Sequence, residues 1–241
     1  MPKSPKSAPR GKSADIDLQG ALDWLRDHAT KATLDGMARY AIPSENALGV
    51  AMRDVQALAK IIGKNHDLAA ELWSSGVYDA RLLACYVDDP ALVTPKQMDA
   101  WAKDFDNWAI VDTVCFALFK KVPHAWPKVA QWATKKDEFI KRGAFALLWA
   151  LAGSADDDAP FTRGLQLIEK AASDDRNFVK KSVNMALRAI GKRSVSLHAA
   201  ACGLAERLAA SKDASAAWIG RDALKELSSP AVARRLGEKP R

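Results

Sequence analysis

The spacing of apolar residues is the feature that most limits the fold of this chain. In one segment after another, Ala, Leu, Ile and Val recur every three or four residues, which is the spacing of one face of an α-helix. No segment shows the two-residue alternation of a half-buried strand, and Gly and Pro fall between the helical segments. The pattern therefore predicts an all-α protein in which short connections place successive helices antiparallel.

Helix boundaries follow from capping residues and helix breakers. Thr94 and Pro95 form a typical helix start, Gly63 marks a stop, and an acidic loop is expected over residues 153–160. Pro127 is expected near a helix start or at a kink, because proline disrupts a helix interior. The expected helices cover residues 16–31, 34–40, 52–62, 66–73, 78–87, 94–103, 107–120, 123–133, 139–151, 161–172, 176–190, 195–210 and 215–227.

The length of 241 residues allows a sizeable core, and 49% of the residues are hydrophobic. We predict one repeat domain over residues 15–228, a disordered basic arm over residues 1–14 and a charged tail over residues 229–241. Residues 1–14 lack the apolar core of a signal peptide, and no apolar run reaches the length of about 18 residues that a membrane span needs. A protein with no membrane contact is expected.

Five of the helical segments share a loose repeat. Each carries a charged residue near its start and then an Ala- and Leu-rich stripe. Successive markers are separated by 30 to 40 residues, a period typical of HEAT-like repeats with two helices each. We therefore predict an α-solenoid of HEAT-like helical repeats, in which the markers line a concave basic groove. The markers are Arg81, Asp112, Arg142, Lys181 and Arg221.

The charge distribution favours a nucleic-acid partner. The formal net charge is +7, and Lys181, Met185 and Arg188 fall on one face of the same expected helix. Each basic residue alone is explained as simply by solvation of a helix surface. Their recurrence at matching repeat positions instead indicates a surface that neutralises DNA phosphates and releases counterions.

Trp108 and Asp112 are the candidate chemical pair. They lie one helical turn apart, about 40° apart around the helix axis, and Phe119 falls at nearly the angle of Trp108. Separately, the tryptophan would be a core residue, and the carboxylate a surface group or a partner of Arg142. Together they suit a cation, because an aromatic face and a carboxylate both stabilise positive charge. A carboxylate in a basic groove is unfavourable for phosphate binding. Stabilisation of a cation would explain why Asp112 is present there.

Cysteine and histidine provide no metal or cofactor site. Cys85, Cys115 and Cys202 are scattered inside apolar helical runs, which indicates buried free thiols in a reducing compartment. No spacing of Cys or His residues indicates zinc, and no glycine-rich nucleotide loop or nucleophile triad is present in the sequence. No cofactor is expected.

Several stretches carry a resemblance to a known family. The chain resembles the bacterial DNA alkylation repair (AlkD-like) DNA glycosylases over residues 34–227, most specifically in the block from residue 101 to residue 115. The carrying stretches are Ala69-Ala70-Glu71-Leu72-Trp73-Ser74-Ser75-Gly76, Asp79-Ala80-Arg81, Met98-Asp99-Ala100-Trp101, Asp106-Asn107-Trp108, Asp112-Thr113-Val114-Cys115, Phe139-Ile140-Lys141-Arg142 and Asn177-Phe178-Val179-Lys180-Lys181.

The resemblance implies a HEAT-like solenoid that clamps duplex DNA and hydrolytically excises cationic 3- and 7-alkylated purines without a metal. By this resemblance Trp108 contacts the sugar of the lesion, Asp112 stabilises the oxocarbenium and positions water, and Arg142 holds the DNA backbone. Met185 departs from the family pattern, because active enzymes carry a second tryptophan at that position. Trp149, seven residues after Arg142, is a further aromatic candidate for the same face.

Three functions remain open from the sequence. The first is a DNA glycosylase acting on alkylated bases in double-stranded DNA, with catalytic Asp112 and Trp108 and with DNA-binding Arg81, Arg142, Lys181, Met185, Arg188 and Arg221. The second is a non-catalytic duplex-binding HEAT-repeat protein, which Met185 favours. The third is a protein-interaction scaffold. We expect a monomer in the bacterial cytoplasm, associated with the nucleoid when bound to DNA.

Overall fold

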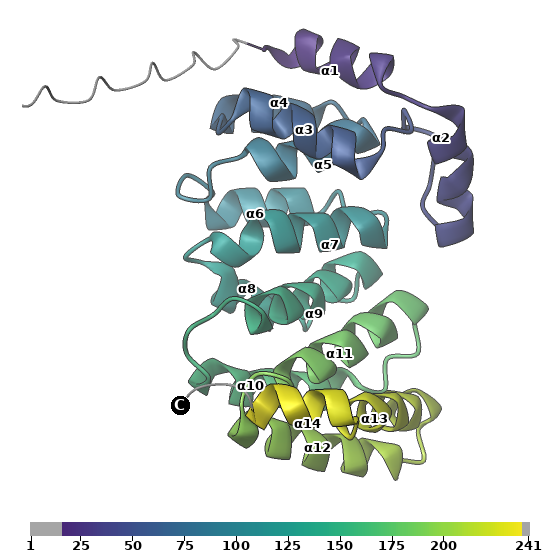
Figure 1. The fold of residues 1–241 in the computed structure, drawn as a ribbon, viewed down its shortest axis with the longest axis vertical. Coiled ribbons are helices and arrows are strands. Elements are labelled where there is room, and N and C mark those ends of the chain that lie inside the picture. Colours follow the sequence, from purple (N-terminus) through teal and green to yellow (C-terminus); the bar gives the residue numbers. More distant parts are fainter. Residues whose placement is uncertain (1–15, 238–241) are drawn as a thin grey trace, which may run out of the picture. The chain divides into compact units, whose positions relative to one another are not determined.

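The structure, a computed structural model, describes residues 16–237 and is built of α-helices (Figure 1). These residues form 14 α-helices and two short 3-10 helices, and their only extended pairing is an isolated bridge between Ala29 and Val50. The all-α prediction is confirmed. The basic arm expected over residues 1–14 lies outside the described residues.

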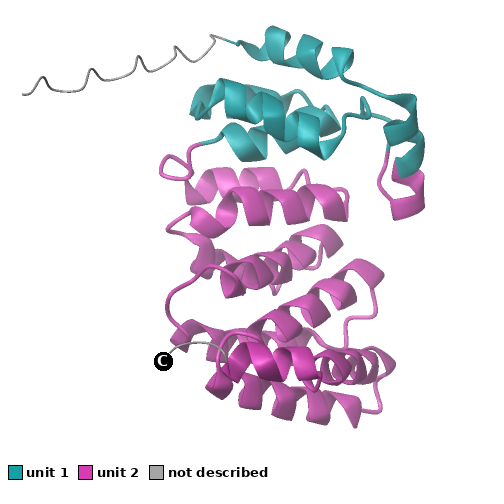
Figure 2. Ribbon diagram, in the orientation of Figure 1, with its two compact units in different colours: residues 1–36, 44–88 teal, residues 37–43, 89–241 magenta. Residues whose placement is uncertain are grey.

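The chain groups into two compact units (Figure 2). The single repeat domain over residues 15–228 stays a prediction. Unit 1 comprises residues 1–36 and 44–88, and unit 2 comprises residues 37–43 and 89–241. The short segment 37–43 therefore belongs to unit 2 although unit 1 flanks it in the sequence.

Unit 1 is organised around α5, against which α1, α3 and α4 pack. The buried Asp79 in the first turn of α5 fixes the loop that leads into α3. Its carboxylate accepts hydrogen bonds from the backbone N–H groups of Leu48 at 2.6 Å, Gly49 at 3.4 Å and Val50 at 2.9 Å. The helices of unit 1 are α1 (Leu18–Asp27), α2 (Lys31–Met37, whose last residue already belongs to unit 2), α3 (Met52–Ile62), α4 (His66–Ser74) and α5 (Tyr78–Val87).

The substitution Asp79→Asn is expected to lower the free energy of unfolding by about 2 kcal/mol, because an amide cannot accept from all three buried N–H groups. Urea unfolding followed by circular dichroism measures this change. The matched control Glu71→Gln, an exposed carboxylate on α4, is expected to change it by less than about 0.5 kcal/mol. Equal effects of the two substitutions would contradict the anchoring role of Asp79.

Unit 2 contains two layers of helices. The second helices of the repeats, α7, α9, α11 and α13, pack against one another in succession, while α8, α10 and α12 each pack against the helix that follows them. The elements of unit 2 are η1 (Ala38–Tyr40), α6 (Pro95–Ala102), α7 (Trp108–Ala117), η2 (Phe119–Lys121), α8 (Ala125–Trp132), α9 (Glu138–Ala152), α10 (Ala159–Ala171), α11 (Asn177–Ile190), α12 (Val195–Ala209), α13 (Ala214–Leu227) and α14 (Pro230–Gly237).

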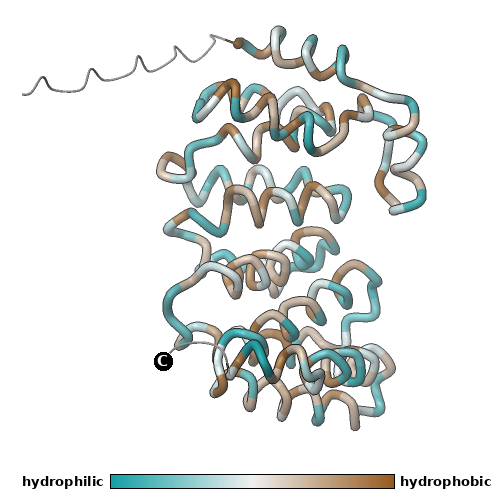
Figure 3. The backbone as a smooth tube through the Cα atoms, in the orientation of Figure 1, coloured by the Kyte–Doolittle hydropathy of each residue, from teal (hydrophilic) through white to brown (hydrophobic). Residues whose placement is uncertain are grey.

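Apolar residues recur along each helix and form the core between the layers (Figure 3). Glycine permits the closest approach between helices. A Cβ added to Gly220 of α13 would lie 2.2 Å from the backbone nitrogen of Ala209 on α12, so only glycine fits there. This packing gives the second helices fixed positions, on which the candidate site depends.

One local expectation differs from the structure. The expected helix 107–120 ends at Ala117, and Phe119 lies in η2, fully buried with its ring centroid 6.2 Å from that of Trp101. Phe119 is therefore a core residue and does not share an exposed face with Trp108. The charged tail contains α14, where Pro230 occupies the first helical position and Val232 is buried.

Candidate functional site

The start of α7 positions the two residues of the candidate chemical pair. The buried side chain of Asn107 caps the helix, its oxygen accepting hydrogen bonds at 3.0 Å from the N–H groups of Ala109 and Ile110. Trp108 is the first residue of α7 and Asp112 the fifth. Both are partly exposed, whereas Ile110 is buried in the core. The cap therefore fixes the indole and the carboxylate on adjoining parts of one helix.

Asp112 forms a two-point ion pair with Arg142 on the neighbouring helix α9. The Arg142 Nε donates to Oδ1 at 3.0 Å and Nη2 donates to Oδ2 at 2.7 Å. The arginine side chain is 4% exposed and the aspartate side chain 19% exposed. Such bidentate pairs fix orientation as well as charge, so the carboxylate is held in one position.

Arg142 also reaches the next helix of the layer. Its Nη1 donates a hydrogen bond of 2.9 Å to the carbonyl oxygen of Phe178 on α11. The side chain thereby links α7, α9 and α11 from a buried position. The guanidinium is buried and engaged by three acceptor atoms. That Arg142 holds the DNA backbone stays a prediction. In the free protein Arg142 positions Asp112.

The Trp108 indole is held by a segment that the sequence did not associate with it. Its Nε1 donates a hydrogen bond of 2.7 Å to the carbonyl oxygen of Tyr40 in η1. The following residue, Ala41, has a φ of 53°, in the left-handed region that non-glycine residues rarely occupy. The Arg142 guanidinium carbon lies 5.9 Å from the Trp108 ring centroid. The indole, the carboxylate and the guanidinium therefore form one cluster.

Burial and the ion pair have opposite effects on the Asp112 carboxyl. Burial raises the pKa of the Asp112 carboxyl above its ordinary value, and the Arg142 guanidinium opposes this shift by stabilising the charged form. A partly desolvated carboxylate lacks the full hydration that it has in water. The bidentate contact with Arg142 compensates its negative charge in this structure.

The other predicted DNA-binding residues occupy three different environments. Lys181 and Arg221 are exposed on α11 and α13, and Met185 is partly exposed on α11. Arg188 is engaged by two carboxylates, at 3.4 Å from Asp222 and in a short contact with Glu226. The positive charge of Arg188 is therefore compensated by carboxylates of the protein. The sequence predicted that this side chain would contact a DNA phosphate.

Arg81 belongs to unit 1, where it lies on α5. Its Nε donates to the carbonyl oxygen of Trp73 at 3.3 Å, and its guanidinium carbon lies 5.4 Å from the centroid of that tryptophan's ring. These contacts fix the Arg81 side chain on α4, the helix that precedes it.

Trp218 is an exposed aromatic residue that the sequence analysis missed. It lies on α13 with 37% of its surface exposed, and the Lys180 Nζ is 5.4 Å from its ring centroid. A signal for it exists in the sequence. Asp112, Arg142 and Lys181 are each the fifth residue of their helix, and Trp218 is the fifth residue of α13. Counting from the helix start therefore identifies Trp218 as the equivalent residue of α13, whereas the sequence repeat had indicated Arg221.

Two structural features are absent from residues 16–237. These residues contain no cluster of three or more His, Cys, Asp or Glu side chains that could hold a metal ion. None of the helices in this range combines the length and the apolar character needed to cross a membrane.

Comparison with known proteins identifies the class and then the family. A solved structure described as "a new family of proteins related to the HEAT-like repeat DNA glycosylases with affinity for branched DNA structures" is similar to this chain with a TM-score of 0.76 and 21% identity. The likeness covers 93% of this chain and 97% of that one, so the fold is that of the HEAT-like repeat proteins. The family model described as "DNA alkylation repair enzyme" matches residues 21–227. The chain therefore belongs to the DNA alkylation repair enzyme family. A search of the curated proteins gives no significant match.

Proposed function

We propose that the protein is a DNA glycosylase that hydrolyses the bond between deoxyribose and a cationic 3- or 7-alkylated purine in duplex DNA. The observation that carries the proposal is the partly buried Asp112 carboxylate, held by Arg142 beside the Trp108 indole. The membership of the DNA alkylation repair enzyme family supports the same reaction class. The reaction uses no cofactor, and a monomer suffices because all three residues lie in one chain.

The reaction begins as the bond between C1′ and N9 of the alkylated purine breaks. Its electron pair passes to the base, which leaves as a neutral molecule, and positive charge develops on the deoxyribose. The Asp112 carboxylate and the Trp108 face stabilise that charge. Water then adds to C1′ and loses a proton to Asp112, which passes it to solvent. Each carboxylate oxygen accepts one hydrogen bond from Arg142 and retains acceptor capacity for this water.

The test is base release from methylated duplex DNA by the full chain. We expect free 3- or 7-methylpurine, measured by chromatography, to accumulate faster than in the protein-free control, while unmethylated duplex releases nothing above background. The absence of release at a protein concentration that saturates DNA binding would contradict the proposal.

The pH dependence follows from the raised pKa of Asp112. The ionised carboxylate is the form that stabilises a cation, so base release is expected to fall as the pH falls through this pKa. The midpoint should lie above the ordinary aspartate value of about 3.9. Initial rates across the acid range, corrected for spontaneous depurination and limited to pH values at which circular dichroism shows a folded protein, measure the midpoint. A constant rate down to the onset of unfolding would contradict the role of Asp112.

A second candidate is a DNA-binding protein that excises no base. Met185, at the position that the resemblance assigns to a tryptophan, and the engagement of both Asp112 oxygens by Arg142 favour it. The protein with a similar structure is described as having affinity for branched DNA. Salt-sensitive DNA binding without release of methylated bases would support this candidate over the glycosylase. Either activity would place the protein at the chromosome.

A further inference from the structure

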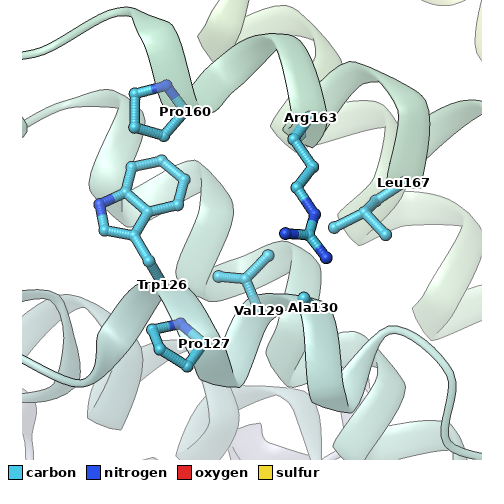
Figure 4. A pocket seen from close by; sticks show the side chains of 8 residues that line it. Trp126, Pro127, Val129, Ala130, Pro160, Arg163 and Leu167 are labelled. Atoms are coloured by element: carbon cyan, nitrogen blue, oxygen red, sulfur yellow. The ribbon is translucent and has the colours of Figure 1, made fainter.

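Two pockets of unit 2 differ in character. The first, which we call the Trp126 groove, has a volume of about 700 Å³ and an apolar lining contributed by α8 and α10 (Figure 4). Trp126 meets Phe161 edge to face at 4.9 Å, and Arg163 is its charged residue. Its residues Trp126 and Arg163 provide matched control substitutions for the second pocket.

The second pocket, which we call the Trp149 pocket, has a volume of about 440 Å³ and a cationic lining. This volume is within the usual range of about 300–1,000 Å³ for small-ligand sites. The lining comes from α7, α9, α11, α14 and the turns that follow α9 and α11. It consists of Phe116, Trp149, Ala152, Gly153, Ser154, Ala155, Asp156, Ala189, Lys192, Arg193 and Arg235.

One wall of the Trp149 pocket is aromatic. Phe116 and Trp149 meet edge to face, with ring centroids 4.6 Å apart and planes at 77°, and both side chains are partly exposed. Small residues such as Ala152 and Ala189 line the same space. An aromatic wall beside small side chains accommodates a planar ring, and nucleobases stack on such walls with little dependence on sequence.

The remaining lining carries positive charge. Arg193 builds the wall, donating to the carbonyl oxygens of Ala152 and Ala155 at 2.7 Å each and to Asp158 at 2.8 Å. Lys192 pairs with Glu226, which Arg188 also contacts. The ion pairs found among residues 16–237 do not include Arg235, whose exposed side chain also lines the pocket. The lining thus holds three cationic side chains and one acidic side chain, Asp156, and two of the cations, Lys192 and Arg193, are paired with carboxylates.

The Trp149 pocket lies on the same helices as the Asp112–Arg142 pair. Phe116 follows Asp112 by four residues on α7, and Trp149 follows Arg142 by seven on α9. At about 1.5 Å per residue these offsets correspond to roughly 6 and 10 Å along the helices. Nucleotides of one strand repeat about every 3.4 Å, so the pocket is two to three nucleotides from a sugar at Asp112.

We propose that the Trp149 pocket receives an unpaired nucleotide of the bound DNA strand, with its base against Trp149 and its phosphate near Lys192 and Arg235. A paired base is stacked between its neighbours, so only an unpaired nucleotide can offer its ring to the aromatic wall. The pairing of an aromatic wall with cations selects this ligand over a simple anion. The inference rests on the proposed action on DNA but does not require base excision.

The experiment compares a duplex with the same duplex carrying one bulged nucleotide. Fluorescence anisotropy with the full chain measures both dissociation constants. We expect wild type to bind the bulged duplex about tenfold more tightly, as stacking of one base allows. Each of the substitutions Trp149→Leu and Arg235→Ala should remove this preference, so that the two dissociation constants differ by no more than about twofold. The matched substitutions Trp126→Leu and Arg163→Ala in the Trp126 groove should keep the wild-type ratio.

Three outcomes would overturn the inference. The first is a wild-type protein with no preference for the bulged duplex. The second is a preference that survives in both Trp149→Leu and Arg235→Ala. The third is calorimetric binding of free deoxyadenosine 5′-monophosphate without a bulge preference, which would assign the pocket to a free nucleotide.

Failure of this inference is distinguishable from failure of the proposed function. If the wild-type protein prefers the bulged duplex but releases no methylated base, the inference about the Trp149 pocket stands and the proposed glycosylase activity is rejected. If the wild-type protein releases methylated base but shows no preference for the bulged duplex, the glycosylase activity stands and the inference about the Trp149 pocket is rejected.

Discussion

The substitution Asp112→Asn is expected to slow the release of methylated purines by about 10²–10³-fold, which corresponds to roughly 3–4 kcal/mol of lost transition-state stabilisation. Asparagine keeps the shape of the side chain but removes the negative charge that opposes the developing cation. It also removes the group that takes the proton from the attacking water. Single-turnover measurements with saturating protein isolate this step, because DNA binding then no longer limits the rate.

Asp174→Asn is the matched control for this substitution. Asp174 also forms a bidentate pair with an arginine, receiving hydrogen bonds of 2.9 and 2.6 Å from Arg176, but it lies before α11 and not beside Trp108. Its removal is expected to reduce stability without slowing base release in the folded protein. If both variants lost activity equally, the effect of Asp112 would be structural and not chemical.

The spacing within α7 was sufficient to predict the candidate pair. Trp108 and Asp112 lie one turn apart, and that relation depends only on helical geometry, which a local sequence pattern determines. The repeat of charged markers likewise located Arg142 on the neighbouring helix. Local periodicity therefore gave the all-α fold and the helices that carry the site.

The contacts that complete the site depend on tertiary packing. The link from Trp108 to the Tyr40 carbonyl joins residues 68 positions apart, and no local pattern encodes it. The depth of Arg142 depends on how α7, α9 and α11 pack, so the sequence indicated a charged residue but not its buried role. Phe119 was misplaced for a related reason. Helix α7 ends two residues before it, and the chain then turns its ring into the core.

The substitution Arg142→Met is expected to lower the free energy of unfolding by about 3–5 kcal/mol, because it leaves the partly buried Asp112 carboxylate without its counter-charge. The carbonyl oxygen of Phe178 loses its donor as well. Urea unfolding followed by circular dichroism measures the change. Arg26→Met, at a pair with Asp23 whose side chains are 51% and 58% exposed, is expected to cost about 1 kcal/mol or less. A change below about 1 kcal/mol for Arg142→Met would contradict this account.

The double substitution Asp112→Leu with Arg142→Met separates the two roles of the pair. Replacing both charges by apolar groups removes the uncompensated carboxylate, so the free energy of unfolding should return to within about 1 kcal/mol of wild type. Base release should remain absent, since no carboxylate is left to stabilise the cation. If the pair served only to hold α7 and α9 together, the double variant would regain activity together with stability. Retention of the charged pair is therefore expected to serve the reaction, since an apolar pair can hold the helices equally well.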